Sequence, residues 1–267
     1  MRARWVLYTA AVLAGGVTAL ALLGPLFAGQ PAEQVGGPYQ GSSWPHPLGT
    51  DGLGRDVLDR VLHGGRVVVG LAVGATALAT AGGLVLGVAL GSVRHRAGEL
   101  LMRVVDVLLV LPPILLLLLL ATGLPGSDLA VLLAVALVTT PTTTRVVRAA
   151  THRVARADYV DVARARGDGW WHILRRDVLP AIARPVLAES GLRFVTAVYL
   201  TATAGFLGLG QPAPAANWGR MVAENLDGAT LTMSPFLAPA VLLVLFTVSV
   251  NLLADGIADL LARGGAA

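Results

Sequence analysis

Long apolar stretches, separated by shorter polar connections, dominate the hydrophobic pattern of this chain. A helix that crosses a bilayer needs about 20 mainly apolar residues. Six stretches approach or exceed this length, which predicts an all-α, polytopic membrane protein with six transmembrane helices. The stretches are Trp5–Ala28, Val67–Val93, Val104–Gly123, Leu129–Val146, Val186–Leu209 and Phe236–Ala254. The first also resembles a signal peptide, but its length and the five later stretches favour an uncleaved anchor.

Three connections are long enough to carry function. The loop at residues 29–66 begins rich in Gly, Pro and Ser, and ends in the amphipathic stretch Asp56–His63. The loop Gln211–Pro235 is predicted on the same side of the membrane. The connection at residues 148–185 is predicted on the opposite side. We therefore expect an anchor helix at residues 1–28, a loop with an amphipathic helix at residues 29–66, and a transmembrane core at residues 67–267.

Composition agrees with a membrane location. Hydrophobic residues make up 55% of the chain, charged residues 13%, and the mean hydropathy is +0.72. A soluble domain needs more charge than this to cover its surface. The pI near 10.3 would suggest a nucleic-acid partner in a soluble protein, but arginines at membrane flanks account for it here and we expect no nucleic acid to bind. The chain has no cysteine, which excludes disulfides and thiolate metal sites.

The chain has twenty arginines and no lysine. The absence of lysine excludes a lysine-dependent phosphate-binding loop, so the chain does not hydrolyse ATP by that route. Basic residues accumulate on the cytoplasmic side of membrane proteins. Counting along the six spans gives fifteen arginines on one side and four on the other, with Arg193 inside the fifth span. Both termini and the connection 148–185 are therefore predicted to be cytoplasmic, and the loop 29–66 extracytoplasmic. The four outside are Arg55, Arg60, Arg66 and Arg220; the fifteen inside are Arg2, Arg4, Arg94, Arg96, Arg103, Arg145, Arg148, Arg153, Arg156, Arg164, Arg166, Arg175, Arg176, Arg184 and Arg263.

The cytoplasmic connection contains the most informative pattern. The stretch Tyr159–Gly167 predicts a short helix that ends at Gly167, because glycine suits the left-handed position after a helix. Asp161 is placed to pair with Arg164 one turn later. Tyr159, Val162, Ala163 and Arg166 are expected to share one face. A second apolar patch follows at Trp170, Trp171, Ile173 and Leu174, and Leu179-Pro180 is expected to close the segment. Such a segment is apolar enough to dock into a groove of a partner.

The spacing of these residues resembles the signature of permease subunits in binding-protein-dependent ATP-driven importers. That signature is Glu-Ala-Ala, three residues, Gly, nine residues, Ile, one residue and Leu-Pro. Here Asp161-Val162-Ala163 precedes Gly167 by three residues, and nine further residues lead to Asp177, Val178 and Leu179-Pro180. The spacing fits throughout, while Asp161, Val162 and Asp177 depart from the family's residue types.

Three further stretches are similar to the second, C-type, permease subunit of the dipeptide, oligopeptide and nickel branch. They are His46–Asp56, Gly205–Gly219 and Asn251–Asp259. The resemblance implies a type I importer permease in a bacterial inner membrane. It implies a homologous second permease subunit, two cytoplasmic ATPase subunits that hold ATP and Mg, and an extracytoplasmic solute-binding protein as partners. It further implies that Tyr159, Asp161, Val162, Ala163, Gly167, Trp170, Trp171, Leu179 and Pro180 couple the chain to the ATPase, and that the chain binds no cofactor and is not itself an enzyme.

Two questions stay open at this level. The substrate is expected to be a di- or oligopeptide, but nickel, a metal chelate or haem fits the same resemblance. A stand-alone secondary transporter or channel is the alternative from another class; such proteins often carry internal repeats, and none is visible here. A membrane scaffold is a further alternative, although it would be expected to lack the two outside loops.

Several other residues invite a functional interpretation. Glu189 and Arg193, one turn apart in the fifth span, form either an intramembrane pair or part of the transport pathway, and pairing is the simpler account.

Asp51, Asp56 and Asp59 lack the spacing of a calcium loop, which favours helix capping and pairing with Arg55 and Arg60. The five histidines are scattered, so no metal site is expected. Pro112, Pro113 and Pro141 predict kinks in the third and fourth spans. The glycines of the second span, Gly74, Gly82, Gly83, Gly87 and Gly91, predict close helix packing.

Overall fold

The computed structural model describes residues 2–92 and 96–263. Within these residues the secondary structure is helical apart from two isolated β-bridges in the loop that precedes α2, which confirms the all-α prediction. Arg94, counted above among the inside arginines, lies outside the described residues. In chain order the elements are α1 (Arg2–Leu23), the 3₁₀ turn η1 (Gly24–Leu26), α2 (Val57–Ser92), α3 (Arg96–Val110), α4 (Pro113–Thr122), α5 (Asp128–Val154), α6 (Asp158–Ala165), α7 (Trp170–Ile173), the π-helical turn η2 (Leu174–Val178), α8 (Leu179–Phe206), α9 (Trp218–Glu224) and α10 (Ser234–Arg263).

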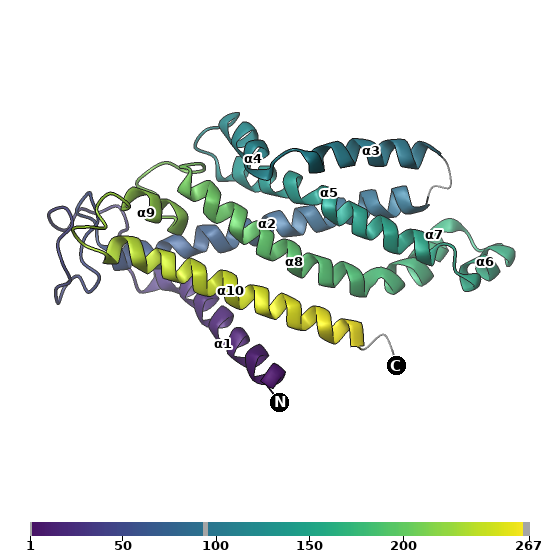
Figure 1. The fold of residues 1–267 in the computed structure, drawn as a ribbon, viewed down its shortest axis with the longest axis horizontal. Coiled ribbons are helices and arrows are strands. Elements are labelled where there is room, and N and C mark those ends of the chain that lie inside the picture. Colours follow the sequence, from purple (N-terminus) through teal and green to yellow (C-terminus); the bar gives the residue numbers. More distant parts are fainter. Residues whose placement is uncertain (1, 93–95, 264–267) are drawn as a thin grey trace.

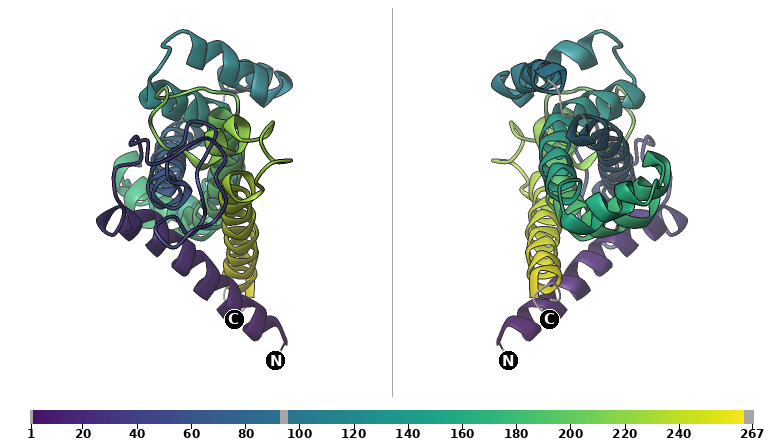
Figure 2. Two further views of the ribbon diagram at one scale, coloured as in Figure 1. Left: turned by 90° about the vertical axis from the view of Figure 1, so that its left-hand side faces the viewer. Right: turned by 90° about the vertical axis from the view of Figure 1, so that its right-hand side faces the viewer.

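Three long helices, α2, α5 and α8, pack against one another and form the centre of the molecule (Figure 1). Their contact surfaces hold the main core, which includes the fully buried Val68, Ala72, Val135 and Ala197. α1 and α10 lie side by side on one side of this centre. α3 and α4 form an arm against α5, on the opposite side from α1 (Figure 2).

The two ends of the molecule differ in structure. One end, the loop end, consists of the loop at residues 27–56, α9 and the connections on either side of α9 (Figure 1). The other end carries α6 and α7, and we call it the α6 end. α1 runs towards the loop end, and α10 runs away from it (Figure 1). This arrangement separates the predicted outside loops from the predicted inside connection by the length of the helices.

Close packing between α2 and α5 depends on glycines at a spacing of four residues. A Cβ added to Gly83 would lie 2.6 Å from Cγ2 of Thr143, and one added to Gly87 would lie 2.6 Å from Cβ of Val147. At Gly91 the corresponding distance to Cβ of Thr151 would be 2.8 Å. Small residues allow helix backbones to approach in this way. The predicted packing role of this glycine stripe is confirmed.

The predicted spans agree with the helices only in part. Four helices of the described chain are long and apolar enough to cross a membrane: Trp5–Leu26, Val57–Ser92, Asp128–Val154 and Ser234–Leu260. The third predicted span is broken, because α3 and α4 meet at an angle of 89° around Leu111 and Pro112. This pair is either one broken span or a re-entrant loop. Val104–Gly123 is therefore not one continuous helix, and the predicted disruption at Pro112 and Pro113 is confirmed.

The fifth predicted span and the predicted amphipathic loop helix also differ from expectation. The fifth predicted span lies within α8, which is not among the four strongly apolar helices because Glu189 and Arg193 fall inside it. The amphipathic stretch Asp56–His63 is not a separate loop helix, since it forms the first turns of α2. Val57 and Val61 on its inner face are buried, as the periodicity predicted. α5 continues through Pro141.

Candidate functional site: the α6 end and the α8 ion pair

The short helix α6 lies at the tip of the α6 end (Figure 1). Val160 and Ala163 are buried, and they pack in a small second core with Ile173 and Val178. The sequence prediction grouped Ala163 with Tyr159, Val162 and Arg166 on one face, and it is wrong for Ala163. Tyr159 and Val162 point away from this core and are 50% and 56% exposed. The helix therefore has one face that anchors it and another that carries exposed apolar side chains.

Gly167 ends this element with a defined backbone geometry. Its φ is +86°, its N–H donates to the carbonyl of Arg164 (2.9 Å), and the N–H of Asp168 donates to the carbonyl of Ala163 (3.1 Å). These two bonds form a Schellman motif, which requires the left-handed conformation at this position. Asp161 and Arg164 pair at 2.8 Å. Both local predictions, the glycine stop and the ion pair, are confirmed.

The predicted second apolar patch divides into two parts. Ile173 and Leu174 are buried in the second core, whereas Trp170 is partly exposed and Trp171 is 62% exposed. The guanidinium of Arg175 lies 4.8 Å from the centre of the Trp171 ring, a cation–π contact that orients the indole. The two tryptophans thus join Tyr159 and Val162 as exposed apolar groups. We call these four residues the apolar tip.

The segment does not close at Leu179-Pro180, so that prediction is wrong. α7, the π turn η2 and α8 follow one another without a break, and Leu179 and Pro180 form the first turn of α8. Pro180 has no N–H to donate into this run, and it directly follows the π-helical turn η2, in which the N–H of Leu179 donates to the carbonyl of Leu174. The apolar tip is therefore connected by continuous helix to the centre of the molecule.

Glu189 and Arg193 form an ion pair on α8. Oε1 of Glu189 lies 2.8 Å from Nε of Arg193, and the side chains are 8% and 20% exposed. The carboxylate approaches away from the N–H direction, so the contact is electrostatic and is not a linear hydrogen bond. The prediction of a pair is confirmed. Within α8, Arg193 lies about 20 Å from either end of the helix at 1.5 Å per residue.

At the loop end, four buried or partly buried charged residues form a cluster that we call the loop clamp: Asp51, Arg55, Arg60 and Glu224. Oδ2 of Asp51 accepts from Nε of Arg55 (2.8 Å) and from Nη1 of Arg60. Oε2 of Glu224 accepts from Nη2 of Arg55 (3.1 Å) and Nη2 of Arg60 (2.9 Å). The predicted pairing of Asp51 with both arginines is confirmed, whereas the role of Glu224 was not predicted.

The other two aspartates of this region also act as structural groups. Oδ1 of Asp56 accepts from the backbone N–H of Asp59 (3.0 Å) at the start of α2, and its Oδ2 lies 2.6 Å from Nδ1 of His46. Oδ1 of Asp59 accepts from the N–H of Gly29 (2.9 Å). In the part of the chain that the structure describes, no group of three or more potential metal ligands lies together.

Comparison with known proteins places this geometry in a family. Residues 83–264 match the family described as binding-protein-dependent transport system inner membrane component. The chain belongs to this family. It is a permease component of a binding-protein-dependent ABC transporter in the inner membrane, and ATP hydrolysis resides in a separate subunit.

Relatives of this permease component include annotated peptide transporters. A putative peptide permease protein of Brucella suis biovar 1 is 35% identical over 219 residues, which cover 81% of this chain and 72% of the relative. The di/tripeptide transport system permease protein DppC of Pseudomonas aeruginosa is 34% identical over 214 residues, covering 80% and 71%. Among solved structures, inward-facing conformations of the MetNI methionine ABC transporter match with a TM-score of 0.60 and 18% identity, covering 74% of this chain and 94% of that one. This last similarity concerns the fold.

Proposed function

We propose that this permease component imports di- or oligopeptides as half of a translocation pathway formed with a homologous second permease subunit. The observation that carries the substrate class is the 34–35% identity to peptide permeases over about four fifths of the chain. The proposed partners are that second subunit, two cytoplasmic ATPase subunits that bind ATP and Mg, and an extracytoplasmic solute-binding protein. Nickel, a metal chelate or haem as substrate would be distinguished by the uptake experiment below.

We propose further that the α6 end docks on the ATPase. Its exposed apolar tip (Tyr159, Val162, Trp170 and Trp171) has the side chains expected of a groove-binding surface. Asp161, Ala163 and Gly167 hold α6 in shape, and Leu179 and Pro180 join it to α8. ATP-driven movement of the ATPase subunits would then be transmitted through α7 and η2 into α8, and would reorient the pathway from outside to inside.

The proposed topology has six spans with both termini in the cytoplasm. It counts the bent pair α3–α4 as one span and α8 as another, in addition to the four strongly apolar helices. The imbalance of fifteen arginines against four supports this orientation. In domain terms, residues 1–28 form the anchor, 29–66 the outside loop with the start of α2, and 67–267 the transmembrane core with its coupling segment 148–185.

Two experiments test these proposals. Uptake of labelled dipeptide, nickel and haem is compared in cells that lack this chain and in complemented cells; restored dipeptide uptake alone is expected, and restored nickel or haem uptake alone would reject the peptide assignment. For topology, single cysteines replace Gln40 and Asp168 in this naturally cysteine-free chain. An impermeant thiol reagent added to intact cells should label the Gln40 site only. Labelling of the Asp168 site only would reverse the topology and remove the coupling proposal.

A further inference from the structure

Arg193 lies beside an open cavity of about 320 Å³ that is lined by residues of α5, α8 and the α3–α4 arm. Most of the wall is apolar and comes from the bent arm, including Leu108, Leu111 and Ile114. Arg193 is the only charged residue of the described chain that lines this cavity. A charged side chain at mid-helix depth in a membrane protein is costly and marks a substrate pathway more often than a structural need.

Three groups around this cavity retain hydrogen-bonding capacity. The pair with Glu189 engages Nε of Arg193, and in the described chain no partner occupies its two terminal nitrogens. The hydroxyls of Thr142 and Tyr199, which also line the cavity, make no hydrogen bond within residues 2–92 and 96–263. By contrast, the hydroxyls of Thr139 and Thr196 donate to carbonyls of their own helices, at 2.8 Å and 3.1 Å. These free donors therefore line the same cavity as the guanidinium.

This arrangement suits a carboxylate attached to an apolar group. The planar guanidinium donates two parallel hydrogen bonds to a carboxylate, and hydroxyls add single donors. Apolar walls accept the remainder of such a ligand, and a volume near 300 Å³ accommodates a small one. Glu189 offsets part of the arginine's charge, which keeps the attraction weak. Weak binding is required of a site on a transport route, since the substrate must also leave.

The same face of α5 continues towards the α6 end. Thr142 lines the cavity of Arg193, and Arg145, one turn further along α5, lines a second hollow of about 480 Å³. Glu99, Asp106, Arg148 and His152 also line this hollow. Arg145 pairs with Asp106 at 2.6 Å, and Arg148 and His152 add two more basic side chains within two turns of α5. The two hollows therefore lie one after the other along the same face of α5, and each is lined by at least one basic side chain.

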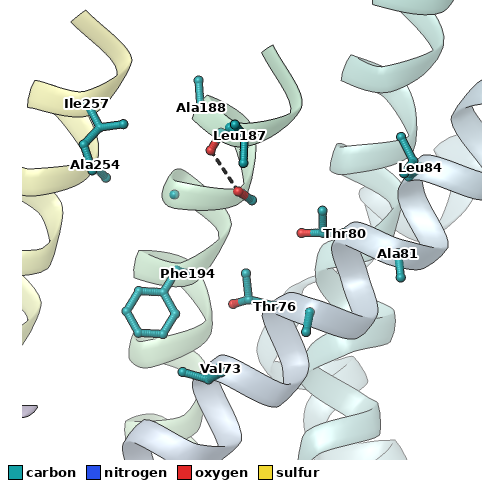
Figure 3. A pocket seen from close by; sticks show the side chains of 13 residues that line it. Val73, Thr76, Thr80, Ala81, Leu84, Leu187, Ala188, Phe194, Ala254 and Ile257 are labelled. Atoms are coloured by element: carbon teal, nitrogen blue, oxygen red, sulfur yellow. Dashed lines mark hydrogen bonds between the residues drawn. The ribbon is translucent and has the colours of Figure 1, made fainter. Parts of the chain in front are cut away.

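A larger cavity of the described chain has no charged group in its lining. It measures about 760 Å³ and lies on another face of α8, among α2, α8 and α10 (Figure 3). Its lining is uncharged, and the hydroxyls of Thr76 and Ser190 within it donate to carbonyls of their own helices, at 2.7 Å and 2.8 Å. The hydroxyl of Thr80, also in this lining, has no hydrogen-bond partner among the described residues. A carboxylate would find there a single unpaired hydroxyl and no basic side chain to balance its charge. The polar cavity is therefore the better route despite its smaller size.

We propose that Arg193, with Thr142 and Tyr199, forms a transient binding site for the C-terminal carboxylate of the transported peptide. This inference rests on the proposed peptide-import function. It assigns the route to the face of α8 that looks towards α5 and the α3–α4 arm. Thr139, Thr196 and the apolar residues of the arm shape the cavity around the bound terminus.

The test measures whether a dipeptide protects a thiol in the cavity from alkylation. The dipeptide is added directly to the complex, so the result does not depend on the specificity of the solute-binding protein. Thr196→Cys introduces a single thiol into the cavity of Arg193, and Ser190→Cys places a control thiol in the uncharged cavity of about 760 Å³. The complete permease–ATPase complex is treated with N-ethylmaleimide, with or without millimolar Leu-Phe or its C-terminal amide, and labelling of this chain is followed on gels. We expect Leu-Phe to slow alkylation of Thr196→Cys at least fivefold and the amide less than twofold. The Ser190→Cys control should change less than twofold with either compound.

Substitutions of Glu189 and Arg193 distinguish a substrate-binding role of Arg193 from a purely structural role. Arg193→Gln should abolish the protection by Leu-Phe, and Arg193→Lys should retain part of it. The double variant Glu189→Gln/Arg193→Gln leaves no unpaired charge, so a structural role predicts that protection returns, whereas our proposal predicts that it stays absent. Equal protection by peptide and amide, no protection by either, or protection that persists in the double variant would overturn the proposal. Peptide uptake by the unmodified transporter is measured in parallel, so that loss of the site and loss of the peptide assignment are told apart.

Discussion

Nη2 of Arg60 on α2 lies 2.9 Å from Oε2 of Glu224 on α9, across 164 residues of sequence. Arg60 is fully buried, and its Nη1 donates to Asp51 in the preceding loop. The loop clamp thus joins the loop before α2 to α9. Two further bonds reinforce the junction: the hydroxyl of Thr232 donates to the carbonyl of Tyr39 (2.9 Å) and that of Ser234 to the carbonyl of Leu48 (2.7 Å). The two long loops at this end therefore form one structural unit.

Asp51→Asn is expected to destabilise the loop end strongly. The substitution leaves two buried guanidinium groups with one carboxylate between them, and breaking a buried pair in this way costs about 3–5 kcal/mol. Thermal unfolding of the purified chain in detergent measures the change. Asp227→Asn, at an exposed acid in the loop after α9, is the matched control and should change stability by less than about 0.5 kcal/mol. Equal effects of the two variants would show that the clamp contributes nothing special.

The folding stability of the chain should also depend on pH through the ionisation of Asp51. Burial opposes ionisation of this carboxyl, but the N–H of Arg55, the charge and hydrogen bond of Arg60 and the N–H of Leu53 together hold its pKa below the ordinary value of 3.8. A lowered folded-state pKa gives a contribution that is complete above the unfolded-state value and is lost as the pH falls through the folded-state value. The contribution of Asp51 should therefore persist down to about pH 4 and vanish below it. Melting curves from pH 6 to pH 3 should show the wild type and Asp51→Asn converging only at the acid end; convergence already at pH 5 would contradict the assignment.

Gly167→Val should impair coupling to the ATPase without affecting membrane insertion. A Cβ at Gly167 meets no atom within 4 Å, so the cost arises from its φ of +86° and amounts to about 1–2 kcal/mol or more for a branched residue. Gly169→Val is a close control, because Gly169 is equally open but has an ordinary φ of −65°. Co-purification of the ATPase and peptide uptake should fall for the first variant and stay near wild type for the second. Unchanged assembly and uptake in Gly167→Val would show that α6 is not the coupling element.

Gly87→Ala should loosen the contact between α2 and α5. The new methyl group would lie 2.6 Å from Cβ of Val147 and 2.9 Å from the backbone nitrogen of Arg148, and overpacking of this kind costs about 1–3 kcal/mol. Gly70→Ala on the same helix meets nothing within 4 Å and should be neutral or slightly stabilising. The melting temperatures of the two variants give the comparison. A loss at Gly70 as large as that at Gly87 would point to a general requirement for glycine in α2.

The features that the sequence predicted correctly are local ones. The stop at Gly167 and the pair of Asp161 with Arg164 depend on residues within one or two helical turns, so spacing and residue type suffice to find them. Glu224 could not be found in this way, because its partners are more than 160 residues away in the chain. The 89° angle between α3 and α4 also escaped prediction: Pro112 indicates a disruption, but packing against α5 sets its direction. Leu179-Pro180 was misinterpreted as an end because proline commonly interrupts a helix, whereas here the helical run continues past it from the π-helical turn η2 into α8.

The unbroken run from α7 through η2 into α8 has a mechanical consequence. At 1.5 Å per residue, the 28 residues of α8 make a rod about 42 Å long, with Arg193 near its midpoint. A tilt of about 10° at the α6 end would displace the far end of such a rod by about 7 Å and its midpoint by about half as much. Arg220 of α9 donates to the carbonyls of Gly208 and Leu209, just beyond the end of α8, which fastens the rod to the loop end. A small tilt of α8 produced at the apolar tip would therefore become a larger displacement at its far end. Because Arg220 connects that end to the loop end, the loops there would move with it.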